Sequence, residues 1–137
     1  MIGRLFNQVD LLHKGLDAAW TRQETISQNI ANVNTPGYKS RRVAFESAFQ
    51  NALAGTSGFS ARRTRARHLA FGGGQSLSEV TPAVVQNDHY TMRMDGNNVD
   101  VEAENAALAE NTIRYDLLSN KMNAEFARMK LAIREGR

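Results

Sequence analysis

The segment NIANVNTPGYK, residues 29–39, ends a long helical pattern and turns the chain. Its three asparagines are weak helix formers whose amides bond to nearby backbone groups, so they are expected to satisfy carbonyls at a helix end. Thr35 precedes a proline, which disfavours the α conformation at Thr35 itself. Pro36 and Gly37 suit the centre of a type II turn, in which glycine supplies the positive φ. The segment therefore predicts a helix stop followed by a defined change of direction.

The residues that follow the turn divide by polarity. Tyr38 and Phe45 are expected to fold back as anchors. Lys39, Arg41 and Arg42 are expected to face outward.

An N-terminal coiled-coil helix is predicted over residues 1–34. Apolar residues recur at spacings of three and four from Ile2 to Val33, and nine of the ten positions in this seam are apolar. Such a seam, sustained over more than four heptads, is typical of a coiled coil. Nothing of comparable length lies beside it in sequence, so the seam needs a partner from elsewhere.

A second coiled-coil helix, over residues 96–137, is the partner that the sequence offers. One apolar line recurs every seven residues, at Val101, Leu108, Tyr115, Met122 and Met129, and is flanked by Leu118, Phe126 and Ile133. Another runs through Ala106, Ile113, Leu117, Ala124 and Leu131. A single partner helix cannot cover both apolar stripes. Packing in a multi-chain array and a place at the centre of a monomeric bundle both fit this pattern.

The ends of this second helix carry favourable charges. Acidic residues cluster where it begins and basic residues where it ends, which complements the helix dipole. Asn97, Asn98 or Asp100 is expected to cap its start.

Between the two arms lies a connecting segment over residues 35–95. Apolar spacing predicts a short helix over 43–54, which Gly55 stops. Residues 55–95 are rich in Gly, Ser, Thr and Arg and predict a flexible loop, with short extended pieces at Val84-Val85 and 89–92. The predicted fold class is mainly α, with the long terminal helices pairing as a coiled coil.

Composition narrows the class of protein. The 137 residues allow one ordinary domain, and no apolar run approaches the roughly 20 residues of a membrane span. Charged residues interrupt the first fifteen positions, so no cleaved signal peptide is expected. The net charge of +3 is segregated, with seven basic residues and one acidic residue in 34–70, and six acidic and one basic in 95–116. Such segregation suits contacts between copies of the chain as well as binding to a polyanion.

No motif predicts catalysis, and neither a cofactor, a metal ion nor a small-molecule substrate is expected. The chain has no cysteine, and its three histidines lack ligand spacing. FGGGQS, residues 71–76, lacks the Gly-Lys-Ser/Thr ending of a phosphate loop. In DGNNVDVE, residues 95–102, the glycine stands second rather than sixth, which does not fit an EF-hand. The basic tract at Arg62, Arg63, Arg65, Arg67 and His68 leaves a nucleic-acid-binding module as an alternative of a different class.

The segment 29–39 closely resembles the signature of the bacterial flagellar axial proteins, in which the N-terminal helix ends in an Ala-Asn-x-x-Thr-Pro-Gly-aromatic-basic segment. Only about sixty residues separate the two arms, too few for the large inserted domains of hook and distal rod proteins. Residues 95–137 are similar to the closing helix of the FlgB-type proximal rod family, and Thr64 and His68 resemble that family's Thr-x-x-x-His segment. Another short proximal rod protein is the nearest alternative.

The resemblance implies a structural subunit of the flagellar basal-body rod. It implies terminal helices that pair and stack with other copies into a torque-transmitting axial tube in the periplasm, after export by the flagellar type III apparatus. Expected partners are other copies, other proximal rod proteins, a small rod-base adaptor and the membrane-ring export gate. Nucleic acid is not expected as a partner.

Two sets of residues are predicted to carry this role. The signature and turn set is Asn29, Ala31, Asn32, Asn34, Thr35, Pro36, Gly37, Tyr38 and Lys39. The helix-packing set is Leu5, Val9, Leu12, Leu16, Ile26, Ile30, Val101, Leu108, Tyr115, Leu118, Met122, Phe126, Met129 and Ile133.

Overall fold

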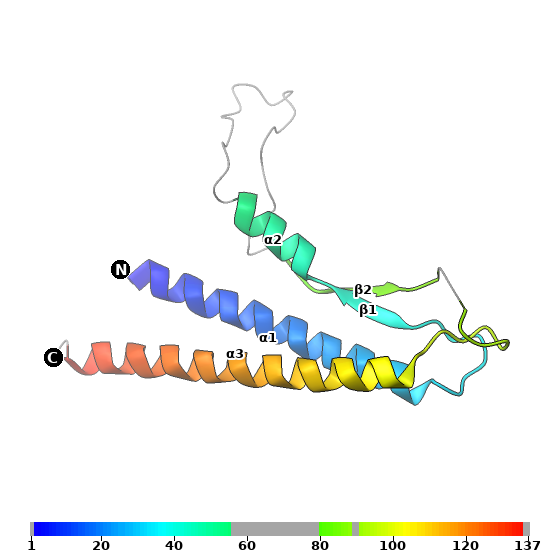
Figure 1. Cartoon of the computed structure of the whole chain (residues 1–137). Coiled ribbons are helices and arrows are strands. Elements are labelled where there is room, and N and C mark those ends of the chain that lie inside the picture. Colours follow the sequence, from blue (N-terminus) through cyan, green and yellow to red (C-terminus); the bar gives the residue numbers. More distant parts are fainter. Residues whose placement is uncertain (1, 56–79, 89–90, 136–137) are drawn as a thin grey trace, which may run out of the picture.

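Two long antiparallel helices form the body of the protein (Figure 1). The computed structural model describes residues 2–55, 80–88 and 91–135. Helix α1 spans Ile2–Ala31 and helix α3 spans Val101–Glu135. At 1.5 Å per residue they are about 45 and 52 Å long. The chain termini lie together at one end of the pair, and the turn after α1 and the loop before α3 meet at the other.

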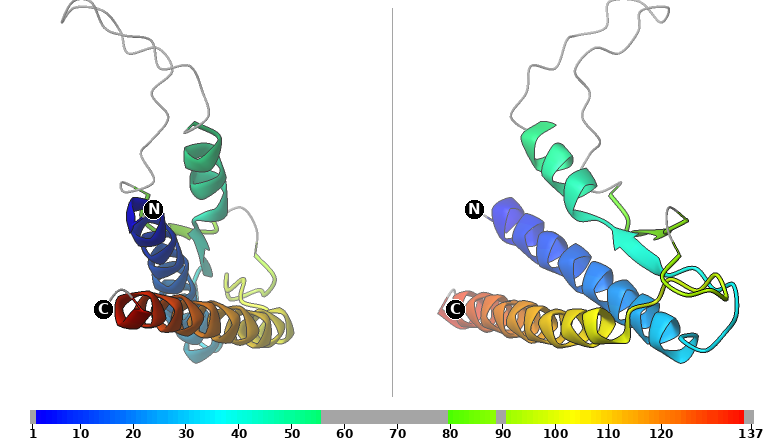
Figure 2. Two further views of the ribbon diagram at one scale, coloured as in Figure 1. Left: turned by 90° about the vertical axis from the view of Figure 1, so that its left-hand side faces the viewer. Right: turned by 45° about the vertical axis from the view of Figure 1, so that its right-hand side comes forward.

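Between the long helices in sequence lie a short helix and a two-stranded sheet. Strand β1 (Arg41–Ala44) leads into helix α2 (Glu46–Gly55), and strand β2 (Ala83–Gln86) returns antiparallel to β1. Arg41 pairs with Gln86 and Ala44 with Ala83. In all three views α1 lies between α3 on one side and α2 with the sheet on the other (Figure 2). The predicted fold class is confirmed, with long terminal helices packed together and a short helix between them.

The boundaries differ from the expected ones where tertiary contacts compete with local pattern. Val43 and Ala44 were expected to begin the short helix, but they pair with Val84 and Ala83 instead. A β-branched residue favours a strand when a partner strand supplies hydrogen bonds, so the helix starts only at Glu46. Helix α1 ends three residues before position 34 in a series of turns, and α3 starts at Val101 rather than at 96. The extended piece at Val84-Val85 is present in β2.

A small apolar core joins α1 to the sheet and α2. Ala18, Val43, Phe45, Ala52 and Val80 are buried together, with Ala48 and Phe49 packed against them. The rings of Phe45 and Phe49 stack with their centroids 5.0 Å apart. The small side chain of Ala18 lets β1 and α2 approach α1 closely. Phe45 is therefore an anchor, as predicted.

The cap at the start of α3 and the turn after α1 have the structures that the sequence predicts. Asp100 caps α3, because its Oδ1 atom accepts hydrogen bonds from the backbone N–H groups of Glu102 at 3.0 Å and Ala103 at 3.2 Å. After α1 the Tyr38 N–H donates to the Thr35 carbonyl, and Gly37 has a φ of 72°. These features are those of the predicted type II turn, with Pro36 and Gly37 at its centre.

Gly15 marks a close approach of α1 and α3. A Cβ atom added to it would lie 3.3 Å from Cδ1 of Leu118, the end of a flexible, half-buried side chain. Alanine is about 1 kcal/mol better than glycine inside a helix. We expect Gly15→Ala to raise the free energy of unfolding by about 0.5 kcal/mol after Leu118 shifts slightly, as measured by urea denaturation. Gly15→Leu, the control, should be destabilising because it separates the helices; a destabilised Gly15→Ala would contradict this packing.

Candidate assembly interface

The first half of the turn region is organised around the buried side chain of Asn29. Its Nδ2 atom donates to the Arg41 carbonyl at 2.7 Å and to Oε1 of Glu104 at 2.9 Å. Its Oδ1 atom accepts from the Arg41 backbone N–H at 2.9 Å and from the Tyr38 hydroxyl at 3.2 Å. One amide at 1% exposure thus joins α1, β1 and α3. Tyr38 folds back, as predicted, onto this amide.

Asn97, from the loop before α3, holds the turns that follow α1. Its Nδ2 atom lies 3.1 Å from the carbonyl oxygens of both Asn32 and Val33 and 2.9 Å from that of Thr35. Its Oδ1 atom accepts from the Val99 N–H at 2.7 Å. These three carbonyls belong to the turns after Ala31, so a residue more than sixty positions away holds the turn region rather than the end of the helix itself. Carbonyls at a helix C-terminus have no partner within the helix. At the end of α1 the Asn32 Nδ2 atom donates to the Gln28 carbonyl at 2.8 Å, which is the role expected of the local asparagines.

The turn at Gly37, after α1, and the turn at Gly96, before α3, face each other beside Asn97. Gly96 has a φ of 84°, and a Cβ atom on it would lie 3.6 Å from the Cα atom of Gly37. The Gly37 N–H donates to the Asp95 carbonyl at 2.9 Å. Both glycines hold a conformation that side chains rarely adopt. The positive φ of each residue, rather than a lack of space, explains why each turn carries a glycine.

Lys39 corrects one expectation, because it does not face outward. It is half-buried, and its Nζ atom donates to the Gly96 carbonyl at 2.8 Å. A cation bound to a loop carbonyl replaces the water that the carbonyl loses on burial. Arg41 and Arg42 are exposed, as expected.

Asn98 ties the same loop to the sheet. Its Oδ1 atom accepts from the Ser40 N–H at 2.6 Å, and its Nδ2 atom donates to the Asn87 carbonyl at 2.7 Å. The Asn87 N–H in turn donates to the Ser40 carbonyl at 2.9 Å. We call the contacts of Asn29, Asn97 and Asn98 the asparagine junction; it fixes the angle at which β1 and α2 leave the helix pair.

Glu46, at the start of α2, connects all three helices. Its carboxylate forms an ion pair with Arg22 of α1, and another with Arg114 of α3 at 3.7 Å. Burial opposes ionisation of Glu46, but hydrogen bonds from its own backbone N–H and from Arg22, together with the charges of both arginines, lower its pKa below the ordinary value. The position of α2 is therefore set by charge as well as by the apolar core.

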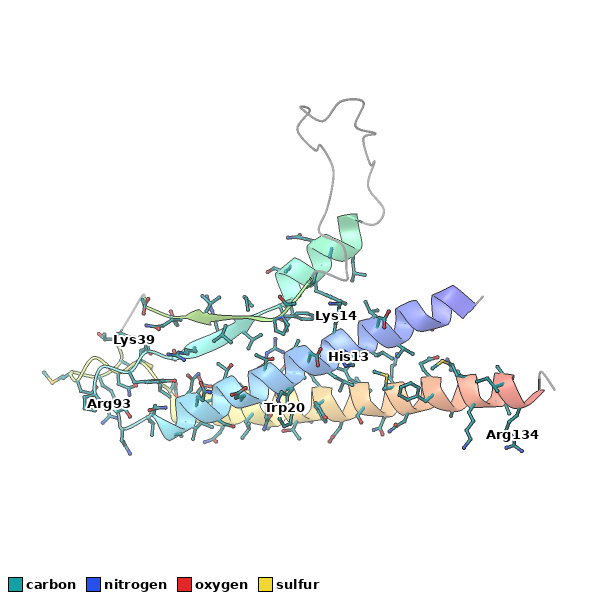
Figure 3. The ribbon with its side chains drawn as sticks, turned by 180° about the vertical axis from the view of Figure 1, so that it is seen from behind. His13, Lys14, Trp20, Lys39, Arg93 and Arg134 are labelled. Carbon is teal, nitrogen blue, oxygen red and sulfur yellow. The ribbon has the colours of Figure 1, made fainter. Side chains whose placement is uncertain are left out.

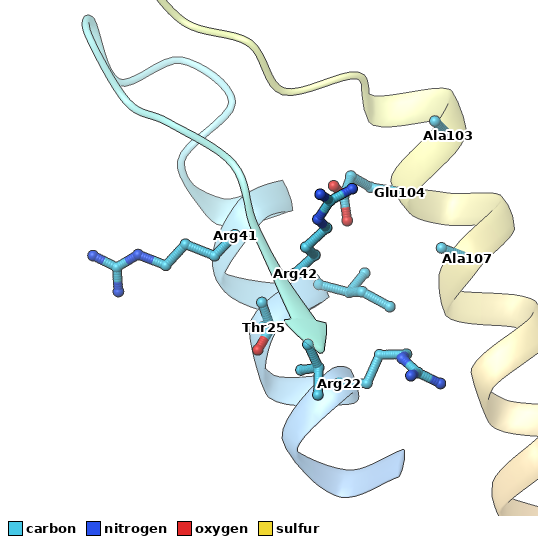
Figure 4. A pocket seen from close by; sticks show the side chains of 9 residues that line it. Arg22, Thr25, Arg41, Arg42, Ala103, Glu104 and Ala107 are labelled. Carbon is cyan, nitrogen blue, oxygen red and sulfur yellow. The ribbon is translucent and has the colours of Figure 1, made fainter. Parts of the chain in front are cut away.

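A pocket of about 290 Å³ lies between α1, β1 and α3, and Glu104 lines its α3 side (Figure 4). Figure 4 shows Arg41 pointing away from α3. Burial raises the pKa of Glu104, the hydrogen bond from Asn29 opposes that rise, and the charge of Asp100 adds to it.

This pKa shift has a testable consequence. Because the folded-state pKa of Glu104 exceeds its ordinary value of 4.5, its contribution to stability is present below that value and is lost as the pH rises through the folded-state pKa. Glu104→Gln keeps an oxygen for Asn29 and carries no charge. We expect Glu104→Gln to have a higher midpoint of thermal unfolding than the parent protein at pH 7, and an equal midpoint at pH 3. A lower midpoint at pH 7 would contradict this assignment.

The outer side of α3 carries an uncovered apolar stripe. Its largest members are Ile113, Leu117 and Leu131, whose exposures are 70%, 60% and 55%. Ala106 and Ala124 on the same line are also exposed. The stripe lies opposite Asn111 and Met122, which face α1 and are buried. Among the described residues, α1 is the element that packs along α3, and the second stripe stays exposed. The array of several chains is therefore the arrangement that would cover it.

The predicted helix-packing residues fall into three groups. Ile26 and Met122 are buried; Val9, Leu12, Leu16, Ile30, Val101, Leu108, Leu118 and Met129 are half-buried; Tyr115, Phe126 and Ile133 are exposed. The side chain of Leu5 lies outside the described residues. Of the signature set, Asn29 is buried, Asn32, Tyr38 and Lys39 are half-buried, and Ala31, Asn34, Thr35, Pro36 and Gly37 are exposed.

Several contacts of the interface escape a reading of the sequence. Asn111 is buried and donates to the Ala19 carbonyl at 2.9 Å, and Asn98 and Glu46 bridge elements far apart in the chain. Asn111 lies on neither apolar line of α3, so the apolar pattern gives no signal for it. The basic tract at 62–68, with Thr64, and His89 lie outside the described residues.

Metal and membrane sites receive no support from the described part of the chain. No group of three or more His, Asp or Glu side chains there is placed to hold a metal ion. None of the described helices is long and apolar enough to cross a membrane.

The sequence is similar to known proteins of one family. Residues 12–39, from α1 through the turn to Lys39, match the family of the flagella basal body rod protein. The flagellar basal body rod protein FlgB of Borreliella burgdorferi is 32% identical over 92% of this chain and 95% of its own length. That of Bacillus subtilis is 32% identical over 92% of both chains, and that of Proteus mirabilis is 28% identical over 99% of this chain and all of its own.

Proposed function

The chain belongs to the FlgB family of flagellar basal body rod proteins, and from this membership we infer that it is a structural subunit of the proximal rod of the bacterial flagellum. The matches cover 92–99% of this chain and 92–100% of the relatives, so these proteins are of nearly the same length and have no large inserted domain. This family role places the protein in the basal body.

One observation carries the assembly mechanism that we propose, namely the exposed apolar stripe of α3. A helix in a single chain that leaves several large apolar residues in water gains free energy when another helix covers them. We propose that α1 and α3 form the packing unit, and that other rod subunits lie against the outer face of α3. Repetition of that contact builds the axial tube that transmits torque. The asparagine junction holds β1 and α2 at a fixed angle to the helix pair.

The partners that fit this role are other copies of the chain, other proximal rod proteins, the rod-base adaptor and the membrane-ring export gate. We propose a periplasmic rod location reached through the flagellar type III apparatus, without cleavage of a signal peptide. The role requires no catalysis, cofactor or small-molecule substrate.

Two alternatives have weaker support. Another short proximal rod protein would share the turn signature, but the relatives described above, which match over nearly the whole chain, are FlgB proteins. A nucleic-acid-binding role rests on the basic tract alone.

Fractionation of basal bodies tests this function. We expect an epitope-tagged copy that supports motility to purify with intact basal bodies and to remain after the hook and filament are sheared off. Recovery only in the soluble fraction would overturn the proposal, and salt-dependent binding to DNA at the same time would favour the nucleic-acid alternative.

A further inference from the structure

A second pocket, of about 230 Å³, lies between α1 and α3. Trp20 and Gln23 line it from α1, and Asn111, Thr112 and Tyr115 line it from α3. Figure 3 shows Trp20 beside α3, while Lys14 points towards α2. Trp20 is 65% exposed and Tyr115 is 39% exposed. Two aromatic side chains thus flank an opening that the helix pair leaves unfilled.

One residue that lines this pocket, Asn111, carries a buried acceptor without a hydrogen-bond donor. Asn111 is 2% exposed, and its Nδ2 atom donates to the Ala19 carbonyl at 2.9 Å and to Oε1 of Gln23 at 3.0 Å. These two acceptors fix the orientation of the amide. Its Oδ1 atom is buried and has no hydrogen-bond partner. A buried acceptor left unsatisfied is destabilising, and a donor that reached it through the pocket would remove that penalty.

The acidic and aromatic side chains around the pocket favour a positively charged hydrogen-bond donor. Asp17 and Glu24 stand three residues before and four residues after Trp20, so they share its side of α1. Asp116 is four residues after Thr112 on α3, and all three acidic residues are exposed. Aromatic faces attract cations, and a guanidinium adds planar N–H donors. An arginine side chain therefore matches the aromatic walls, the acidic rim and the buried acceptor together. The exposed aromatic side chains can turn aside to admit it.

We propose that this pocket receives an arginine from residues 62–68 of a second copy of the chain. That tract holds four arginines in seven positions, and no acidic residue lies between Glu46 and Glu79 to neutralise it. The other basic region, at the end of α3, contains acidic residues and pairs Arg128 with Glu125 at 2.9 Å. Charge complementarity thus favours the tract as the occupant.

This contact deepens the proposed rod function and rests on it, because it supplies a specific link between neighbouring copies in addition to the apolar stripe. The pocket lies on the α1–α3 seam, away from the outer face of α3. The two contacts are therefore separable by mutation.

A peptide titration tests the pocket directly. The receptor is the full-length chain with Arg62, Arg63, Arg65 and Arg67 each changed to Ala, so that its own tract cannot compete. The probe is the peptide SARRTRARHLA, residues 60–70. Trp20 is the sole tryptophan, so its fluorescence reports on the pocket. We expect a saturable change in Trp20 emission that weakens with added salt, because the rim is charged.

Matched variants separate the pocket from general charge attraction. Tyr115→Ala and Asn111→Ala should each weaken peptide binding about tenfold. Ile113→Ala, on the outer stripe, should leave it unchanged. A peptide with lysine in place of each arginine should bind at least about threefold more weakly. Circular dichroism checks that each variant is folded. If Asn111→Ala does not fold, Tyr115→Ala still tests the pocket, because Tyr115 is exposed and its replacement should not unfold the protein.

Three results would overturn the proposal. The first is the absence of any Trp20 response to the peptide. The second is equal peptide binding by Tyr115→Ala and the parent receptor. The third is a Trp20 emission spectrum of the native chain that differs from the spectrum of the four-alanine variant at every dilution. The last result would assign the contact to the chain's own tract. Because the titration needs no basal body, its failure leaves the rod function standing. Loss of the protein from basal bodies, with peptide binding intact, would instead count against the function.

Discussion

Ile113→Glu combined with Leu117→Glu is expected to abolish incorporation into basal bodies, and with it motility, without unfolding the protein. Both side chains are exposed in the single chain and lie one helical turn apart on the outer stripe. Glutamate is a good helix former, so circular dichroism of the purified variant should match the parent. In an assembled rod two carboxylates would be buried without partners, at a cost of several kcal/mol.

Asn123→Glu with Ala127→Glu is the matched control. These residues are exposed and have the same spacing, but they lie about 80° around α3 from the first pair, since ten residues make just under three turns. We expect this variant to assemble and to support motility in soft agar. Equal motility of the two variants would remove the outer stripe from the assembly mechanism.

Asn97→Ala should give the largest loss of stability of any substitution in the loop before α3. It removes a donor shared by three backbone carbonyls, each of which keeps another hydrogen bond, and it removes the acceptor of the buried Val99 N–H. A buried N–H group left without a partner costs roughly 1–3 kcal/mol, and the weakened contacts of the carbonyls add to it, so we expect a loss of about 2–3 kcal/mol.

Urea denaturation followed by far-ultraviolet circular dichroism measures this loss. Asn123→Ala, at an exposed site of α3, is the control and should change the free energy of unfolding by less than about 0.5 kcal/mol. If both variants unfolded at the same urea concentration, the asparagine junction would not hold the turn region together.

Local chemistry made much of the fold predictable. The heptad lines define the two long helices, and Thr35, Pro36 and Gly37 define the turn, because their conformational preferences act within a few residues. The start of α2 was misplaced because β1 pairs with β2 from about forty residues away. A periodic pattern carries no information on such a partner.

The interface was less predictable because most of its contacts are long-range. Asn29 was singled out as part of a signature, but its bonds to Arg41 and Glu104 need the folded chain. Lys39 was expected in solvent because a lysine after a turn is usually hydrated, yet the opposing loop offers it the Gly96 carbonyl. Asn97 was expected as a cap for the helix that follows it, whereas its amide bonds to the turns after α1, more than sixty residues earlier.

Accessibility of Leu117 in isolated protein and in intact basal bodies tests the central claim most directly. The chain has no cysteine, so Leu117→Cys introduces a single thiol, and Asn123→Cys gives a control on another side of α3. We predict that a maleimide labels Leu117→Cys in the free protein, where the position is 60% exposed, and fails to label it in basal bodies. Equal labelling of Leu117→Cys in both states, with the protein present in the basal bodies, would contradict assembly through the outer face of α3.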